Sequence, residues 1–361
     1  MHVGGPAATF IEPTTETDFI AAIRAADESG TPLLVLGGGS NMLVGDDGFA
    51  GVVIKDARTG FTSVPDPADD AAVLVTAVAG QNWDELVAAT VANSWSGLEA
   101  MSGIPGTVGA APVQNIGAYG RDVSGVITSV RVWDRLLGEV RTLTGDELGF
   151  GYRNSNLKRS MLASATSDDP RAPWLPTPRY VVLDVTMKLG VDSQSLPVKW
   201  PELLDILNIE LGDRVPSVVV REEVLKLRDR KGTLERPLHP GGAVDYDRWS
   251  AGSFFTNPLL TAEQSAALPD DAPRFPVAGN SALIETPAAW LIDTAGFPRG
   301  FGVHGATSRA TSSSKHPLVM TNRGNANAAD IVELARTIRD GVKAKYNVEL
   351  VPEPIFVGVE L

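Results

Sequence analysis

Three polar side chains in distant parts of the chain have the chemistry to act on an anionic substrate. Arg153 stands in the turn GYRNSN, and its guanidinium offers a planar pair of donors to a carboxylate or phosphate. Ser253 lies among small residues in WSAGSFFTNP, and Glu353 stands between two prolines in VPEPIF. Ordinary roles stay open for all three, because arginine and glutamate are mostly exposed and serine often caps a helix. No GxSxG pattern surrounds Ser253, so a hydrolase nucleophile is unsupported.

Two glycine-rich segments could bind a phosphate-bearing ligand. The first, LGGGSNMLV (36–44), follows an expected strand, and its glycines allow backbone N–H groups to turn toward an anion. It has neither the GxGxxG spacing of a dinucleotide fingerprint nor the GK[ST] of a P-loop. A tight turn is the alternative interpretation.

The second segment, SGIPGTVGAAPVQNIGAYG (102–120), is punctuated by glycine and proline and shows little helical or strand periodicity. It has few large side chains, so it buries little apolar area by itself. It must therefore wrap a ligand or pack beneath other elements. Because long irregular loops of low charge in compact domains are usually functional, we expect it to contact a ligand.

Composition narrows the classes of ligand and partner. The net charge of −13 disfavours a protein that binds nucleic acid, which would need a basic surface. Without cysteine, disulfides, thiolate catalysis and cysteine-bound iron–sulfur clusters are excluded. The four histidines, His2, His239, His304 and His316, lack metal-ligand spacing, so we expect no metal site.

The sequence also bears on location. The start MHVGGPAATFIEP lacks the charged segment and apolar core of a signal peptide, and no apolar run reaches the length of a membrane span. We therefore expect a cytoplasmic protein with no membrane association and no evident obligate protein partner.

Apolar spacing and end signals predict the elements that would position these residues. The helical period over 16–29 ends at Gly30, and Asn82 with Glu85 marks the start of a second helix. Further helices are expected over 288–295, with Pro287 at its first position, and over 327–346. Strands are expected over 31–36, 51–56, 73–80, 129–134, 139–144 (a hairpin with the preceding strand), 179–189 and the strand-like end 348–361. This mixed order predicts an α+β fold, and the polar stretch 232–248 suggests a boundary.

Taken together and in this order, the motifs resemble those of the UDP-N-acetylenolpyruvoylglucosamine reductases, the MurB family. The most specific are QNIGAYG and AGSFFTNP. The resemblance spans nearly the whole chain through GGGSN (37–41), SGIPGTVGAAPVQNIGAYG (102–120), YRNS (152–155), AGSFFTNP (251–258), AAWLID (288–293) and PEPIFVG (352–358).

The resemblance implies the FAD-binding fold of the vanillyl-alcohol-oxidase type, with two subdomains and a third α+β domain that binds substrate. Residues 1–57, rejoined by 347–361, would form the first subdomain. Residues 58–231 would form the second subdomain, and residues 232–346 the substrate-binding domain.

The resemblance also implies roles for individual residues. Arg153, Ser253 and Glu353 match catalytic positions of the family, and Tyr152, Lys231 and Asn257 match substrate contacts. Trp200 and Thr294 depart from the family pattern, where tyrosine and glutamine are usual. The implied FAD-binding residues are Gly37, Gly38, Gly39, Ser40, Asn41, Gly103, Ile104, Pro105, Gly106, Thr107, Gly109, Ala110, Asn115, Gly117, Ala118 and Tyr119.

The implied activity is NADPH-dependent reduction of a nucleotide sugar, UDP-N-acetylglucosamine enolpyruvate, to UDP-N-acetylmuramate on non-covalent FAD. Hydride should add to the carbon remote from the carboxylate, because the resulting charge then delocalises into the carboxylate. Arg153 and a protonated Glu353 would stabilise that charge, and Ser253 would supply the proton. An oxygen-using oxidase on the same fold and a non-catalytic nucleotide-sugar binder are the alternatives.

Overall fold

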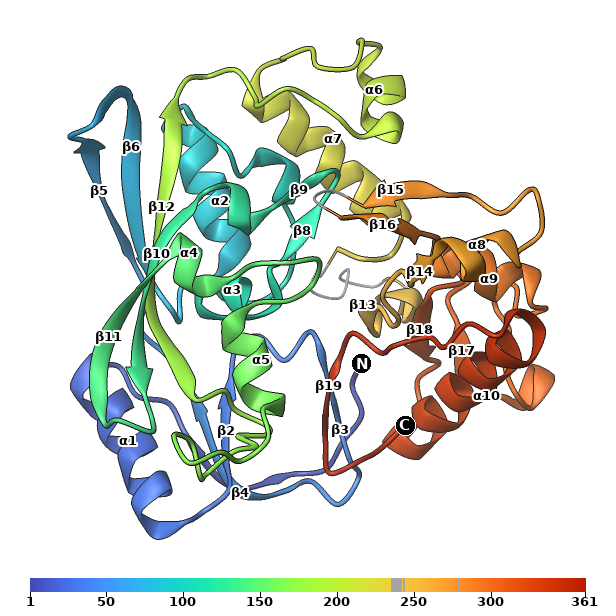
Figure 1. Ribbon diagram of the computed structural model, residues 1–361, viewed down its shortest axis with the longest axis horizontal. Helices are drawn as coiled ribbons and strands as arrows, with labels where there is room; N and C mark the ends of the chain where they lie inside the picture. Colours follow the sequence, from blue (N-terminus) through green and yellow to red (C-terminus); the bar gives the residue numbers. More distant parts are fainter. Residues whose placement is uncertain (235–241, 243, 278–279) are drawn as a thin grey trace. The chain divides into compact units, whose positions relative to one another are not determined.

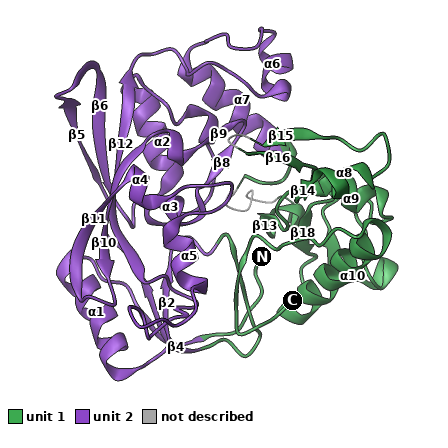
Figure 2. Cartoon of the chain, viewed as in Figure 1, with its two compact units in different colours: residues 1–6, 40–49, 230–361 green, residues 7–39, 50–229 purple. Residues whose placement is uncertain are grey.

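The computed structural model describes residues 1–234, 242, 244–277 and 280–361. These residues form two units, shown in different colours in Figure 2. Unit 1 comprises Met1–Pro6, Ser40–Phe49 and Arg230–Leu361, and unit 2 comprises Ala7–Gly39 and Ala50–Asp229. Part of the predicted boundary stretch 232–248, including His239, lies outside the described residues.

The main sheet of unit 2 has six strands in the order β11-β10-β12-β6-β5, with β7 paired to β12 (Figure 1). Apolar side chains of β6, β10 and β12 pack with Trp83 and Leu86 of α2 in one buried cluster. The predicted hairpin and the strands expected over 73–80 and 179–189 are confirmed. Their bounds are β5 Phe61–Asp66, β6 Asp69–Val78, β7 Trp95–Ser96, β10 Ile127–Asp134, β11 Glu139–Thr144 and β12 Tyr180–Val191.

A second sheet of three strands has the order β1-β4-β2, with β2 and β4 parallel. Helix α1 begins after Thr15, whose hydroxyl accepts from the Asp18 N–H, and ends at Gly30 in the left-handed conformation (φ 65°). The predicted end of this helix at Gly30 is therefore confirmed. The predicted start of the next helix is also confirmed, because Asn82 is the N-cap of α2. The bounds are β1 Ala7–Ile11, α1 Glu16–Ser29, β2 Leu33–Leu36, β4 Phe49–Lys55 and α2 Trp83–Ala92.

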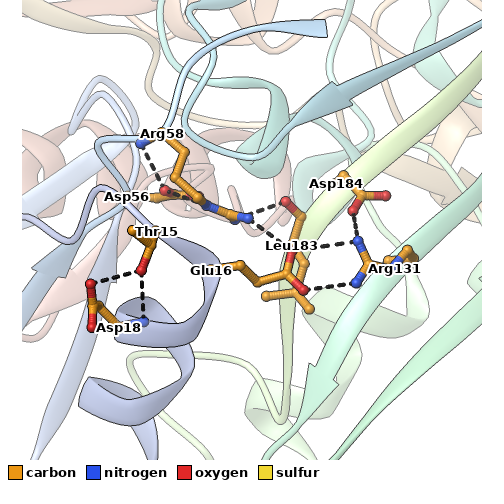
Figure 3. A network of polar contacts seen from close by, with 8 residues as sticks. All are labelled: Thr15, Glu16, Asp18, Asp56, Arg58, Arg131, Leu183 and Asp184. Atoms are coloured by element: carbon orange, nitrogen blue, oxygen red, sulfur yellow. Dashed lines mark hydrogen bonds and ion pairs between the residues drawn. The ribbon is translucent and has the colours of Figure 1, made fainter. Parts of the chain in front are cut away.

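A buried arginine joins the two sheets (Figure 3). Arg58 donates to both carboxylate oxygens of Asp56, at 2.7 Å for the closest pair, and to Glu16 of α1 at 3.0 Å. The same guanidinium donates to the Leu183 carbonyl of β12 at 2.9 Å. Arg131 adds a second ion pair to Glu16 at 2.8 Å. This network holds α1 and the end of β4 against the main sheet.

Among the remaining helices of unit 2, α3 lies inside the second glycine-rich segment, α4 and α5 follow β11, and α6 and α7 follow β12. The bounds are α3 Ala111–Gln114, α4 Gly145–Leu148, α5 Asn156–Leu162, α6 Pro201–Leu207 and α7 Ser217–Arg230, with short 3-10 turns at Glu99–Met101, Val108–Ala110 and Val123–Gly125. The irregular path predicted for 102–120 holds only in part, because residues 108–114 form a 3-10 turn followed by α3, and residues 117–118 form a strand.

Unit 1 contains two small antiparallel sheets, β13-β18-β17 and β14-β16-β15, and a parallel pair, β19-β3. One apolar face of α10, including Ile331, Leu334 and Ile338, packs into the buried cluster of this unit. The bounds are β3 Met42–Val44, β13 Ser250–Ser253, β14 Leu259–Thr261, α8 Ala262–Ala266, β15 Phe275–Val277, β16 Asn280–Glu285, α9 Ala288–Thr294, β17 Ala310–Ser312, β18 Val319–Asn322, α10 Ala328–Tyr346 and β19 Ile355–Val357.

Two end predictions in unit 1 need correction. Pro287 is the N-cap of α9 rather than its first helical residue. The strand-like end over 348–361 contains only the three-residue strand β19, because Pro352 and Pro354 carry no N–H for a ladder. Among the described helices, none is long and apolar enough to cross a membrane.

Candidate active site

In unit 2, the glycines of the first glycine-rich segment, Gly37–Gly39, lie beside the second segment. A Cβ at Gly38 would stand 2.7 Å from the Cα of Gly106, and one at Gly37 would stand 2.9 Å from the Thr107 hydroxyl. Gly39 has a φ of 66°, a backbone that favours glycine. Sequence reasoning placed both segments on one ligand, and the fold brings their bare backbones together directly after β2.

The second segment is anchored on the end of β6 and the start of α2. The N–H of Trp83 donates to the Gly106 carbonyl at 3.1 Å, and the N–H of Gly109 donates to the Ala79 carbonyl at 2.8 Å. A Cβ at Gly109 would stand 2.6 Å from that of Ala79, so glycine is needed for this close approach. The segment therefore packs on other elements while its neighbouring residues meet Gly37 and Gly38.

Residues 115–119 form a tight corner after α3. Asn115 is buried with a φ of 49°, and its amide donates to the Gly151 carbonyl at 2.9 Å. Gly117 and Ala118 form β8, which pairs with β9 (Arg121–Asp122) through a turn at Tyr119 and Gly120, both with positive φ. Such two-residue turns suit antiparallel strands because their twist matches. Trp200 contacts the Tyr119 ring edge-on, with centroids 6.3 Å apart.

Arg153 is held against this corner. Its guanidinium donates to the Gly117 carbonyl at 2.9 Å and to the Asn115 carbonyl at 3.5 Å. It also lies 5.6 Å from the centroid of the Tyr152 ring, which is 42% exposed. The backbone of Arg153 is left-handed (φ 48°), a conformation that costs a non-glycine residue on the order of 1–3 kcal/mol. The turn therefore orients one arginine at the cost of local strain.

Ser253 and Glu353 lie on neighbouring segments of unit 1. Ser253 is the exposed last residue of β13, and the Phe254 and Phe255 that follow are fully buried. The N–H of Glu353 donates to the Phe254 carbonyl at 2.8 Å, and Phe255 bridges to Pro352. The segments that carry Ser253 and Glu353 are thus joined by backbone contacts of Phe254 and Phe255, although the two residues come from motifs a hundred positions apart.

Asn41 contacts the same glutamate. Its side-chain amide donates to the Glu353 carbonyl at 3.4 Å, and the N–H of Ile355 donates to the Asn41 carbonyl at 3.0 Å. These bonds extend the parallel pairing of β3 with β19. The motif GGGSN therefore divides: its glycines lie in unit 2, whereas Ser40 and Asn41 lie in unit 1.

The remaining predicted substrate residues also lie in unit 1. The Asn257 amide donates to Glu285 at 2.7 Å, and its oxygen accepts from the Ala288 N–H at 3.0 Å, at the start of α9. Lys231 is half-buried and directly follows α7. The Thr294 hydroxyl donates to a carbonyl of its own helix. Arg153 belongs to unit 2.

Sequence reasoning missed a cluster that fixes Gly103. Asp84 accepts from the Gly103 N–H at 2.6 Å and pairs with Arg221 through two hydrogen bonds, at 2.6 and 2.9 Å. Burial alone would raise the pKa of Asp84, but its hydrogen bonds to Arg221 and Gly103 hold that pKa below its usual value. Arg228 donates to the Gly103 carbonyl at 2.9 Å. The sequence feature that could have indicated this cluster is the pair Arg221 and Arg228, which lie two turns apart on one face of α7.

The remaining predicted cofactor residues complete the two segments. Ile104, Pro105 and Thr107 lie between the 3-10 turns that begin at Glu99 and Val108, and Ala110 ends the second of these turns. Among the described residues, no group of three or more His, Asp or Glu side chains is arranged to hold a metal ion.

Two family matches divide the chain. Residues 7–144 match the family described as "FAD binding domain". Residues 244–357 match "UDP-N-acetylenolpyruvoylglucosamine reductase, C-terminal domain". The glycine-rich segments fall in the first match, and Ser253, Asn257 and Glu353 fall in the second.

Whole-chain relatives carry the same description. The chain is 45% identical to the UDP-N-acetylenolpyruvoylglucosamine reductase of Cutibacterium acnes over 99% of this chain and 87% of that protein. It is 44% identical to the enzyme of that name from Nocardia farcinica, over 100% and 87%. The crystal structure of the Thermus caldophilus reductase has a similar fold, with a TM-score of 0.58, 23% identity and coverage of 98% and 94%.

Proposed function

The chain belongs to the UDP-N-acetylenolpyruvoylglucosamine reductase family, and we propose that it reduces UDP-N-acetylglucosamine enolpyruvate to UDP-N-acetylmuramate for peptidoglycan synthesis. It is an FAD-dependent oxidoreductase that uses NADPH as reductant. The observation that carries this function is 45% identity along 99% of the chain to a reductase of that name. The predicted family and the α+β fold with an FAD-binding domain are thereby confirmed.

The glycine-rich backbone of unit 2 fits the FAD diphosphate. At Gly37 and Gly38 an added Cβ would collide with residues 106–107, so the two segments can approach only as bare backbone. Backbone N–H groups exposed in this way suit phosphate oxygens. Bound FAD, once reduced, supplies the hydride for the substrate. We assign Gly37–Gly39 and Gly103–Ala110 to the diphosphate, and residues 115–119 to the flavin ring.

We further divide the chain by role. Residues 1–57 with 347–361 form the first FAD-binding subdomain, 58–231 the second, and 232–346 the substrate-binding domain. The two sheets of unit 2, joined by Arg58, support the separation of the first two subdomains.

Arg153 stabilises the charge that develops on the substrate carboxylate. The enol ether is conjugated to that carboxylate, so reduction at the remote carbon leaves an enolate with extra charge on the carboxylate oxygens. A fixed guanidinium fork binds these oxygens through two parallel hydrogen bonds and favours the transition state over the ground state. The bonds from Arg153 to the Gly117 and Asn115 carbonyls support this role, because they hold the fork in advance of the reaction.

Glu353 assists when its carboxyl is protonated and donates a hydrogen bond to the same oxygens. A site desolvated by substrate, beside a second carboxylate, favours the protonated form. Glu353 stands between Pro352 and Pro354, two residues before β19 pairs with β3.

Ser253 donates the proton to the carbon next to the carboxylate. Its exposure at the end of β13 supports this role, since a general acid must reach the substrate.

Tyr152, Lys231 and Asn257 contact the substrate, with Lys231 meeting an anionic group. Because NADPH is regenerated inside cells, we place the enzyme in the cytoplasm, with a nucleotide sugar as its ligand and no nucleic acid, membrane or obligate protein partner.

Replacement of Ser253 by alanine tests this assignment. Under anaerobic conditions, stopped-flow mixing with NADPH should bleach the flavin of Ser253→Ala at the parent rate, because that half-reaction needs no proton at the enol ether. Reoxidation by substrate should slow about 10²–10⁴-fold, the usual loss for a positioned general acid. If reoxidation is as fast as in the parent, Ser253 is not the acid. If both half-reactions slow and flavin is lost, the serine is structural.

A further inference from the structure

Glu353 has an unusually constrained backbone. Pro352 and Pro354 have no N–H, so the Glu353 N–H is the one backbone donor of Pro352–Pro354, and it bonds to Phe254 at 2.8 Å. A residue before proline is also biased toward an extended conformation. The backbone of Glu353 is therefore biased toward an extended conformation, and its N–H fixes it to Phe254.

The other end of the residue is fixed from a different part of the chain. The Glu353 carbonyl accepts from the Asn41 amide at 3.4 Å, while the Asn41 carbonyl accepts from the Ile355 N–H at 3.0 Å. Together these bonds begin the register of β3 with β19, in which Met42 pairs with Ile355. Glu353 is thus held between Phe254, which follows Ser253, and Asn41, which follows the glycines.

We propose that Asn41 is a positioning residue for Glu353 rather than a side-chain ligand of FAD. It holds the Glu353 carbonyl so that the carboxyl meets the substrate carboxylate, and it ties this geometry to the chain directly after Gly37–Gly39. The inference rests on the proposed role of Glu353. It reassigns a residue that the motif GGGSN alone groups with the cofactor.

The test compares Asn41→Ala with the parent in FAD-saturated full-length enzyme. We expect the FAD dissociation constant and the rate of flavin reduction by NADPH to stay within about twofold of the parent. Reoxidation by UDP-N-acetylglucosamine enolpyruvate should slow about 10–100-fold, because small misplacements of a catalytic group cost on this order. A weaker affinity for FAD with an unchanged rate of reoxidation would make Asn41 a cofactor ligand and overturn the proposal.

Asn41→Asp separates positioning from packing. Aspartate keeps the shape of asparagine but at pH 8 presents an acceptor to the Glu353 carbonyl. We expect reoxidation to slow at least as much as in Asn41→Ala, whereas a packing role predicts the milder effect for aspartate. If neither variant binds FAD at saturating concentration, Asn41 supports the cofactor site itself and the proposal is wrong.

Thr256→Val is the matched control. The Thr256 hydroxyl donates to the Val351 carbonyl at 3.3 Å, so this near-isosteric change removes a similar bond on the same segment, two residues before Glu353. We expect both half-reactions to stay close to the parent rates. Equal slowing in Thr256→Val and Asn41→Ala would show a general loosening of the segment and contradict the specific role of Asn41.

Glu353→Ala distinguishes failure of this inference from failure of the proposed function. If Glu353→Ala leaves reoxidation unchanged, the role of Glu353 is wrong. If Glu353→Ala slows reoxidation but Asn41→Ala does not, only the positioning role is wrong. When both slow it, adding Asn41→Ala to Glu353→Ala should change the rate little further, since residues that act through one group are not additive.

Discussion

At the scale of single residues, the left-handed backbone of Arg153 lowers stability and so calls for a functional explanation. Left-handed residues other than glycine are uncommon, and here the strained turn places a guanidinium on the carbonyls of Asn115 and Gly117. Strain of this kind persists where the surroundings determine it and often marks a functional site. Arg153 is therefore held in advance of the charge that it is proposed to stabilise.

Arg153→Lys should lower turnover although it keeps the charge. An ammonium lacks the planar fork that donates two parallel hydrogen bonds to a carboxylate. Loss of one such stabilising donor costs about 10²–10³ in rate, so kcat should fall by that factor while the FAD content stays at parent level. Arg159→Lys, at an exposed arginine on α5, is the control and should keep parent kcat. An unchanged kcat in Arg153→Lys would make Arg153 structural.

Residue types were more predictable than residue contacts. The motifs identify Ser253 and Glu353, and the structure places them on adjoining segments. The same motifs group Asn41 with the glycines, although it contacts Glu353, because the β3-β19 pairing joins segments some three hundred residues apart. A long-range pairing of three residues leaves no local periodicity from which it could be predicted.

At the scale of elements, the two glycine-rich loops depend on each other. Gly38→Ala should weaken FAD binding, because the added Cβ would stand 2.7 Å from a backbone atom of Gly106 and one loop must move. Overpacking of this kind costs about 1–3 kcal/mol, which corresponds to about 5–150-fold in the FAD dissociation constant. Flavin fluorescence after titration into the FAD-free protein measures it. Gly125→Ala, where no atom lies within 4 Å of the added Cβ, should bind FAD like the parent.

A buried carboxylate at the end of β10 should make stability depend on pH. Burial alone would raise the pKa of Asp134, but hydrogen bonds from Arg179 and from the N–H groups of Leu136 and Leu137 outweigh it and lower that pKa. A lowered pKa contributes stability that is present above about pH 4, the unfolded value, and is lost as the pH falls through the folded value.

Asp134→Asn should therefore lower the free energy of unfolding by about 3 kcal/mol at pH 7, since it removes the closer charged partner of Arg179 and leaves only the longer ion pair to Asp169, at 3.7 Å, among the described residues. The difference from the parent should shrink as the pH falls below about 4. Urea unfolding followed by tryptophan fluorescence over this range measures both. The exposed Asp146→Asn on α4 is the control and should change stability little at either pH. A difference that is the same at pH 7 and pH 3 would contradict the pKa argument.

Long helices with a regular apolar spacing were predictable from the sequence, whereas helices whose spacing is hidden by extra apolar residues were not. Helices α1, α2 and α10 were predicted with their starts, because the apolar period and the capping residues agree. Helix α7 was missed, since three consecutive valines in SVVVREEVLKLRDR hide the helical spacing of its buried residues, Val220, Val224 and Leu227. Because α7 was not predicted, the contacts of its residues Arg221 and Arg228 around Gly103 were not predicted either.

At the scale of the whole molecule, the proposed site residues are divided between the two units, and the family relationship is what relates them to each other. Unit 2 carries the glycine-rich loops and Arg153, and unit 1 carries Ser253, Glu353, Asn257 and Lys231. Identity of 45% along the chain, and not any single motif, shows the family, and we propose on that basis that these residues serve one reaction. An oxidase on the same fold would pass electrons from the flavin to oxygen, and a non-catalytic binder would hold no flavin.

The most direct test is the visible spectrum of the purified protein without oxygen. We predict the absorption of bound, oxidised flavin, its bleaching on addition of NADPH, and its return on addition of UDP-N-acetylglucosamine enolpyruvate, with a product heavier by one hydride and one proton. A colourless protein, or flavin that NADPH does not bleach, would contradict the account. So would reduced flavin that recovers its colour with oxygen but not with the enolpyruvate substrate.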